Sequence, residues 1–84
     1  MTAKVLSVWV VDDDASVRWV LERALTNEGI DTRVFDSADA LFDALRDAVP
    51  DVLISDVRMP GTDGLEAMHR LVREGFSFPV IVIT

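Results

Sequence analysis

Four aspartates occupy positions at which carboxylates could act together. Asp12, Asp13 and Asp14 come directly after the apolar run Val5–Val11, and Asp56 ends a second, shorter apolar run. Such runs, rich in β-branched residues, predict strands buried on both faces of a parallel sheet. Ligands of these sheets bind outside the carboxyl ends of the strands, near the point where the strand order reverses. The sequence therefore predicts that these acids meet at one edge of a sheet.

Carboxylates that meet in this way need a cation between them. Two unit charges about 4 Å apart repel by about 4 kcal/mol at an effective dielectric constant near 20. Mg²⁺ suits such a site because it takes few protein oxygens and keeps its waters, and it can also bridge to a phosphoryl oxygen. An aspartate can itself accept a phosphoryl group. Thr84, at the end of the last apolar run, could donate its hydroxyl to that group.

The elements that must position these side chains alternate along the chain. Strands are expected at 5–11, 30–35 (as an edge strand), 51–56 and 78–84 (as a buried strand). Between them, apolar residues at helical spacing predict three helices, and these carry the inward positions Val17, Val20, Leu21, Ala24 and Leu25; Leu41, Ala44, Leu45 and Ala48; Leu65, Met68, Leu71 and Val72. Asp14 or Ser16 could cap the first helix, and Ser37 the second. This order predicts the α/β class, with a parallel sheet covered by helices on both faces.

Composition excludes several kinds of function. The net charge is −7, and the eight basic residues are scattered with no two adjacent, which argues against nucleic-acid binding by this segment. There is no cysteine, so no disulfide or thiolate metal site can form. No signal peptide and no membrane-spanning run is present. We expect a cytoplasmic protein.

Several short motifs together resemble a known family. They are Val10-Val11-Asp12-Asp13, Asp56 followed by Met59-Pro60-Gly61 and Asp63-Gly64, and Val82-Ile83-Thr84. The combination is similar to bacterial response-regulator receiver domains, which have a flavodoxin-like fold. The stretches around Trp9, Arg18-Trp19 and Val57-Arg58 resemble most closely the nitrogen-regulation transcriptional activators of the NtrC type.

The resemblance implies a role for each residue of the site. Asp56 would be the phospho-acceptor, and Mg²⁺ would be held by Asp13 and Asp56, with Asp12 acting through a water. The main-chain carbonyl of Arg58 would be a further metal ligand, and Thr84 would be the switch hydroxyl. Such a domain is not an enzyme and has no catalytic residue of its own. Because Asp14 is also acidic, Asp13 and Asp14 remain an alternative acting pair, although we favour Asp12 and Asp13.

The resemblance also implies partners and further segments. The phosphoryl donor would be a sensor histidine kinase, and the output would be a transcriptional activator of nitrogen metabolism. DNA and sigma-54 polymerase would be contacted only by downstream domains. The family's fifth strand, its two flanking helices and its phosphoryl-binding Lys have no counterpart in residues 1–84, so we expect the N-terminal part of a single receiver domain with an incomplete sheet. Without that Lys, phosphorylation is expected to be weak.

Three alternatives remain at this point. Asp12-Asp13-Asp14-Ala15-Ser16 fits the nucleophile motif of haloacid-dehalogenase-type phosphatases, in which Asp12 would be the nucleophile and Asp14 the general acid. The chain could also be a non-phosphorylated interaction domain that keeps the receiver fold. Finally, a fourth strand without a further neighbour would expose an apolar edge, and we expect the chain to self-associate through it.

Overall fold

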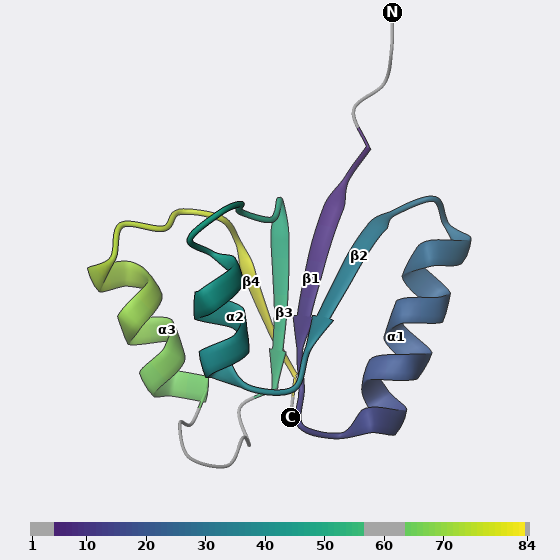
Figure 1. The fold of residues 1–84 in the computed structure, drawn as a ribbon, viewed down its shortest axis with the longest axis horizontal. Coiled ribbons are helices and arrows are strands. Elements are labelled where there is room, and N and C mark those ends of the chain that lie inside the picture. Colours follow the sequence, from purple (N-terminus) through teal and green to yellow (C-terminus); the bar gives the residue numbers. More distant parts are fainter. Residues whose placement is uncertain (1–4, 57–63, 84) are drawn as a thin grey trace, which may run out of the picture.

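The computed structural model describes residues 5–56 and 64–83, and the following statements concern these residues. Seven elements alternate along them (Figure 1). They are β1 (Ser7–Val11), α1 (Ala15–Asn27), β2 (Asp31–Phe35), α2 (Ala38–Ala44), β3 (Val52–Asp56), α3 (Gly64–Arg73) and β4 (Val80–Ile83).

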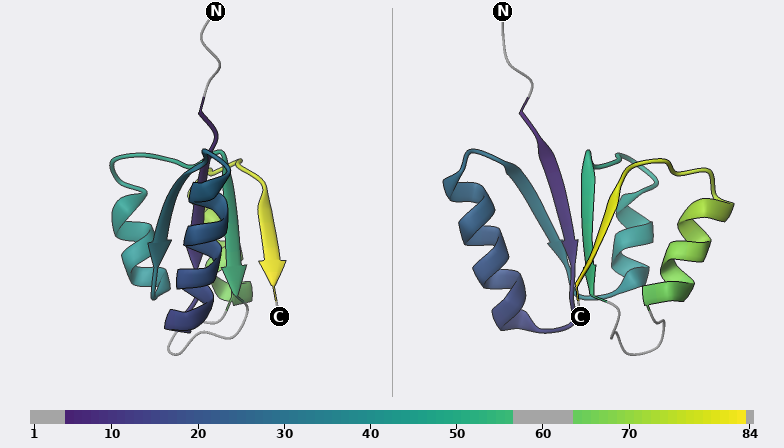
Figure 2. Two further views of the ribbon diagram at one scale, coloured as in Figure 1. Left: turned by 90° about the vertical axis from the view of Figure 1, so that its right-hand side faces the viewer. Right: turned by 180° about the vertical axis from the view of Figure 1, so that it is seen from behind.

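The strands form one parallel sheet in the order β2-β1-β3-β4. Helix α1 lies on one side of the sheet, and α2 and α3 lie on the other (Figures 1 and 2). The predicted α/β class, the parallel sheet with helices on both faces and the position of β2 at an edge are therefore confirmed. The strand order reverses at β1, because the chain leaves β1 for β2 on one side and later adds β3 on the other.

The register of the strands brings the predicted acids to one edge. Val11, the last residue of β1, pairs with Phe35 on β2 and with Ser55 on β3. Asp12 and Asp56 are the residues that follow Val11 and Ser55, so both stand at the carboxyl end of the sheet. This edge adjoins the strand-order reversal, where open α/β sheets bind their ligands.

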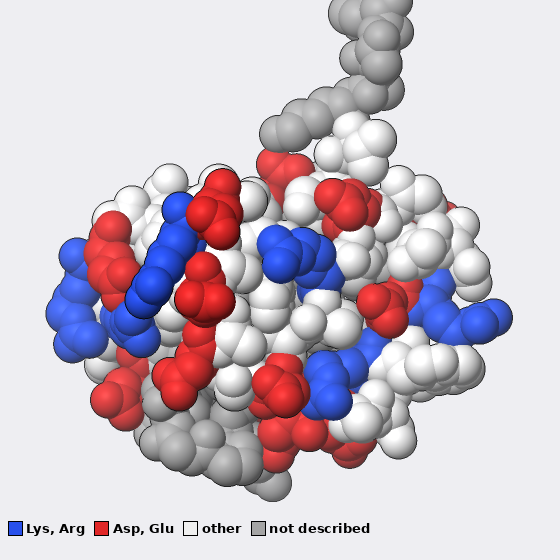
Figure 3. Space-filling model, viewed as in Figure 1, with Lys and Arg blue, Asp and Glu red and all other residues white. Residues whose placement is uncertain are grey.

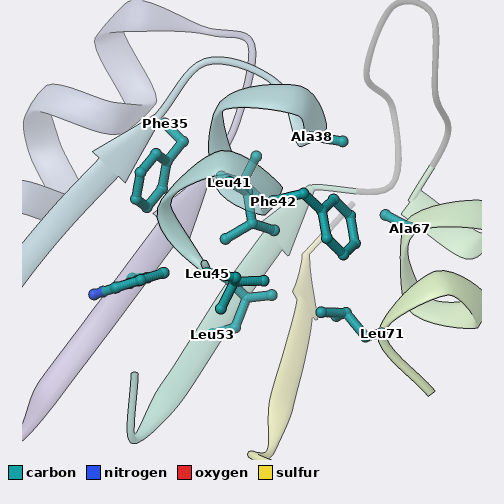
Figure 4. Close-up of a cluster of buried hydrophobic side chains, with 10 residues drawn as sticks. Phe35, Ala38, Leu41, Phe42, Leu45, Leu53, Ala67 and Leu71 are labelled. Carbon is teal, nitrogen blue, oxygen red and sulfur yellow. The ribbon is translucent and has the colours of Figure 1, made fainter. Parts of the chain in front are cut away.

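The hydrophobic core occupies the face of the sheet beneath α2 and α3 (Figure 4). Trp9 and Leu53 contribute from the two central strands, and Phe42 and Leu71 from the helices. The rings of Trp9 and Phe35 are tilted by 57° with centroids 5.2 Å apart, a favourable aromatic geometry. Because alternate residues of a strand point to opposite faces, Trp9 and Val11 anchor β1 to this core.

Within residues 5–56 and 64–83, the opposite face is covered by α1 alone. Val8 and Val10 are buried there, but no residue of α1 is itself buried. Val20 and Ala24, predicted to point inward, are exposed. That prediction was wrong because, in the described part of the chain, α1 packs only against the sheet. Apolar side chains at the border of its sheet-facing side therefore stay exposed to solvent.

The predictions for the other two helices also need correction. Ala48 is exposed because α2 ends at Ala44. On α3, Leu65 and Val72 are exposed, while Ala67 and Leu71 point into the core. Ser37 caps α2 as predicted, since its hydroxyl accepts a hydrogen bond from the Ala40 amide at 3.1 Å.

Strand β4 begins later than predicted and is more exposed. It begins at Val80 rather than at Phe78 and runs to Ile83, the last described residue, and its side chains at Ile81 and Val82 are 52% and 40% exposed. The prediction of a buried strand was wrong, because β4 lies at the edge of the described sheet and pairs only with β3 there. Among the described strands it is an apolar edge strand.

Candidate metal and phosphoryl site

Asp12 is fixed where β1 leaves the sheet. Its amide donates to the Phe35 carbonyl at 3.1 Å, which continues the β1–β2 ladder by one residue. The residue is buried, with 3% of its surface exposed. One oxygen of its carboxylate, Oδ1, accepts a hydrogen bond from the Asp14 amide at 2.8 Å. This Asx-type turn holds the carboxylate in place at the start of the loop.

Asp14 has a different role, as the cap of α1. Its Oδ1 accepts hydrogen bonds from the amides of Ser16 at 2.8 Å and Val17 at 3.4 Å. These are two of the amides that a helix N-terminus leaves without a partner. Of the two residues predicted as possible caps, Asp14 is therefore the one used. The carboxylate is engaged with the helix, which favours Asp12 and Asp13 as the acting pair.

The structure brings three of the predicted site residues together. Asp12, Asp13 and Asp56 each offer a carboxylate oxygen, and the three oxygens lie within 4.8 Å of one another. Asp12 is buried, Asp56 is half-buried and Asp13 is exposed, so the cluster opens from the sheet toward solvent. Acidic side chains gather at the lower edge of the molecule in Figure 3, the edge at which β1 and β3 end in Figure 1.

This donor set fits a hard divalent cation. Three carboxylates supply oxygen ligands only, and the exposed side leaves room for water, a combination that suits Mg²⁺. Without a cation, charges at these separations repel by about 3 to 4 kcal/mol per pair at an effective dielectric constant of about 20. A divalent cation among these oxygens would relieve that repulsion.

The pKa of Asp12 reflects its burial first and its charged neighbours second. Burial raises it above its ordinary value, and the negative charges of Asp56, Asp13 and Asp14 raise it further. The hydrogen bond from the Asp14 amide acts in the opposite direction, because it stabilises the ionised form. The protein therefore holds a carboxylate where its charge is unfavourable in the absence of a cation.

Arg18 supplies a contact that the sequence did not suggest. Its Nη1 donates to the main-chain carbonyl of Asp12 at 2.7 Å. A signal was present, because side chains in a helix lean toward its N-terminus and an Arg in the first turns of α1 can reach the preceding loop.

Other predicted site residues lie outside the described part of the chain. They are Arg58, whose carbonyl was predicted as a metal ligand, Thr84, the predicted switch hydroxyl, and the turn Met59-Pro60-Gly61.

A parallel α/β sheet with aspartates clustered at its strand-order reversal is typical of a domain that binds a charged ligand at that edge. Residues 8–84 match the family described as the response regulator receiver domain. The chain belongs to this family, and its role in two-component signalling is to accept a phosphoryl group. Receiver domains are regulatory modules rather than conventional enzymes. Because the chain matches the receiver family over residues 8–84, the receiver interpretation is preferred to the haloacid-dehalogenase-type phosphatase.

Within the receiver family, the chain can be compared with individual relatives and solved structures. Over 76 residues, 90% of the chain, it is 50% identical to the DNA-binding transcriptional regulator NtrC of Klebsiella pneumoniae, and it spans 16% of that protein's length. It superimposes on the solution structure of the beryllofluoride-activated NtrC receiver domain with a TM-score of 0.84 and 45% identity, covering 98% of this chain and 66% of that one. For full-length FixJ from B. japonicum the TM-score is 0.88 at 38% identity, covering 99% and 40%. The resemblance to NtrC-type receivers is confirmed.

Among the helices that the structure describes, none has the length and apolar character needed to cross a bilayer.

Proposed function

We propose that Asp56 accepts a phosphoryl group from a sensor histidine kinase, at a Mg²⁺ site formed with Asp12 and Asp13. The observation that carries this proposal is the convergence of three carboxylate oxygens, from two separate strand ends, within 4.8 Å. Asp56 stands at the end of β3, and the main chain of that strand is held between β1 and β4. A nucleophile on a central strand is held rigidly relative to its neighbours.

For phosphoryl transfer, the chain has to position the acceptor and to stabilise negative charge. One oxygen of the Asp56 carboxylate forms a bond to phosphorus while the bond from phosphorus to the donor's imidazole nitrogen breaks, and the departing imidazole takes up a proton. Asp12 and Asp13 would hold Mg²⁺, with the Arg58 carbonyl as a further ligand, and Thr84 would donate its hydroxyl to the phosphoryl group. When bound, Mg²⁺ would neutralise charge on the phosphoryl oxygens.

The proposed output follows from the relatives. Several are named DNA-binding transcriptional regulator NtrC. We propose that this receiver likewise controls a transcriptional activator of nitrogen metabolism in the cytoplasm, with DNA and sigma-54 polymerase contacted by other domains.

Acetyl phosphate tests the proposal without a kinase. The chain is incubated with acetyl phosphate and Mg²⁺, and the mass of one added phosphoryl group is sought by intact-protein mass spectrometry. Asp56→Asn should lose the adduct, and so should the wild type with excess chelator. Asp36→Asn is a matched control on an aspartate outside the cluster and should keep it.

The opposite results are equally clear. An adduct that survives in Asp56→Asn would place the acceptor elsewhere. No adduct together with no Mg²⁺ binding by calorimetry would favour an interaction domain that keeps the receiver fold but is not phosphorylated.

We also propose that the chain self-associates through β4. All four of its residues are apolar, and Ile81 and Val82 are exposed on an edge strand. Such an edge offers unpaired main-chain groups to a second strand. By contrast, β2 at the other edge carries Asp31 and Arg33, and charged side chains discourage pairing.

Light scattering over a concentration series measures this association. The wild type should show an average mass that rises with concentration, and Val82→Lys should lower that mass toward the monomer, because a charge on the edge opposes pairing. The matched substitution Thr32→Lys on β2 should leave the association unchanged. A monomeric wild type across the series would contradict the proposal.

A further inference from the structure

Arg18 contacts the loop between β1 and α1, which carries Asp12, Asp13 and Asp14. Its guanidinium donates to the main-chain carbonyl of Asp12, 2.7 Å away, and the contact is partly buried. Asp12 is thereby held on three sides: its amide by β2, its Oδ1 by the Asp14 amide and its carbonyl by α1. The residue that begins the loop is tied to a strand and a helix at once.

The choice of the carbonyl over a carboxylate matters for metal binding. A guanidinium paired with a carboxylate would occupy the oxygens that a divalent cation needs. Arg18 instead donates this hydrogen bond to a main-chain carbonyl. A carboxylate oxygen from each of Asp12, Asp13 and Asp56 lies within 4.8 Å of the other two. Arg18 can therefore order the loop without replacing the metal.

We propose that Arg18 is a positioning residue that preorganises Asp12 and Asp13 for Mg²⁺ by clamping the β1–α1 loop to helix α1. The inference rests on the proposed function, because it concerns the metal site used there. Removing a residue that hydrogen-bonds to a metal ligand, without touching the metal, commonly weakens metal binding by about tenfold or more. Arg18 acts on the main chain of a ligand residue in the same manner.

Helix α1 also offers a matched control. Arg23 lies on the same helix, but its guanidinium stacks over the exposed Trp19 ring, 5.1 Å from the centroid. Removing Arg23 changes the net charge by the same amount as removing Arg18. A difference between the two variants therefore reports the contact with the loop and not the charge of the protein.

The test is calorimetric titration of the chain with Mg²⁺ alone. Arg18→Met keeps an apolar stem and removes the donor, and we expect its dissociation constant to rise about tenfold. Arg18→Lys should recover part of that loss, since it keeps the charge and one donor, and Arg23→Met should match the wild type. Hydrogen exchange of the Asp13 and Asp14 amides, measured without Mg²⁺, should be faster in Arg18→Met only.

The results of these titrations decide whether Arg18 positions the metal ligands. If Arg18→Met binds Mg²⁺ as tightly as the wild type, or if it is merely less stable while its affinity is unchanged, Arg18 is structural and the proposal fails. No recovery in Arg18→Lys would also overturn it. If Arg18→Met does not fold by circular dichroism, Arg18→Leu, which also lacks a donor, takes its place with the same expectation. A wild type that does not bind Mg²⁺ contradicts the proposed function itself, which is a distinct outcome.

Discussion

Strand β1 belongs to two regions that differ in their physical character. Its middle, at Trp9, lies in the core beneath α2 and α3, where apolar side chains exclude water. Its carboxyl end leads to Asp12, a buried acid whose ionised form is disfavoured by burial and by three neighbouring aspartates. The core region stabilises the fold, whereas the ionised Asp12 in the acid cluster opposes it. The molecule thus uses one strand to hold an unfavourable arrangement of charge in a fixed geometry.

Truncation in the core should have the largest effect. Leu53 on β3 is 1% exposed and packs in the core cluster, so Leu53→Ala should lower the free energy of unfolding by about 2–5 kcal/mol. Leu65→Ala removes the same atoms from a side chain that is 63% exposed and should change it by less than about 0.5 kcal/mol. Urea unfolding followed by circular dichroism measures both. Equal losses in the two variants would mean that the core does not lie where the structure puts it.

A substitution in the acid cluster should raise the free energy of unfolding, the opposite of a truncation in the core. Asp12→Asn removes one of the repelling charges, so in the absence of Mg²⁺ it should raise the free energy of unfolding, by about 1 kcal/mol. The same substitution should weaken Mg²⁺ binding, because it removes a carboxylate ligand. Asp43→Asn, on an exposed acid of α2, is the matched control and should change neither quantity. A destabilised Asp12→Asn would show that the charge is already compensated without metal.

The pH dependence should differ between these regions as well. Since the pKa of Asp12 is raised in the folded state, its contribution to stability is fully present below its unfolded pKa of about 3.9 and is lost as pH rises through the folded pKa. The difference in melting temperature between Asp12→Asn and the wild type should therefore grow as pH rises from about 4 to 7 without Mg²⁺. The Leu53→Ala difference, which involves no titrating group, should be nearly independent of pH. A constant difference for Asp12→Asn would contradict the raised pKa.

A last effect concerns a helix cap on the core side, and it should be confined to stability. Ser37→Ala removes the hydroxyl that accepts from the Ala40 amide, and it should destabilise the chain by about 1 kcal/mol without altering Mg²⁺ affinity. Chemical denaturation and calorimetry on the same samples test both statements. A change in Mg²⁺ affinity would mean that the cap of α2 is coupled to the acid cluster across the sheet.

Sequence patterns were sufficient for the sheet and for the meeting of the acids, because both follow from short-range rules. Continuous apolar runs indicate parallel strands, and the carboxyl ends of adjacent parallel strands meet at one edge, which places Asp12 near Asp56. Patterns were insufficient for the helix faces. Val20 and Val72 have helical spacing, yet they are exposed, since burial depends on what packs against a helix and not on its own periodicity. The contact from Arg18 to Asp12 depends on side-chain direction and loop shape, which spacing alone does not specify.

The central claim is that Asp56, and not another member of the cluster, accepts the phosphoryl group. Treatment of the chain with acetyl phosphate and Mg²⁺, reduction of the acyl phosphate with tritiated borohydride and peptide mapping by mass spectrometry identify the acceptor even at low occupancy. We predict label on Asp56, and none there in Asp56→Asn. Label on Asp12 or Asp13 in the wild-type chain would contradict the account.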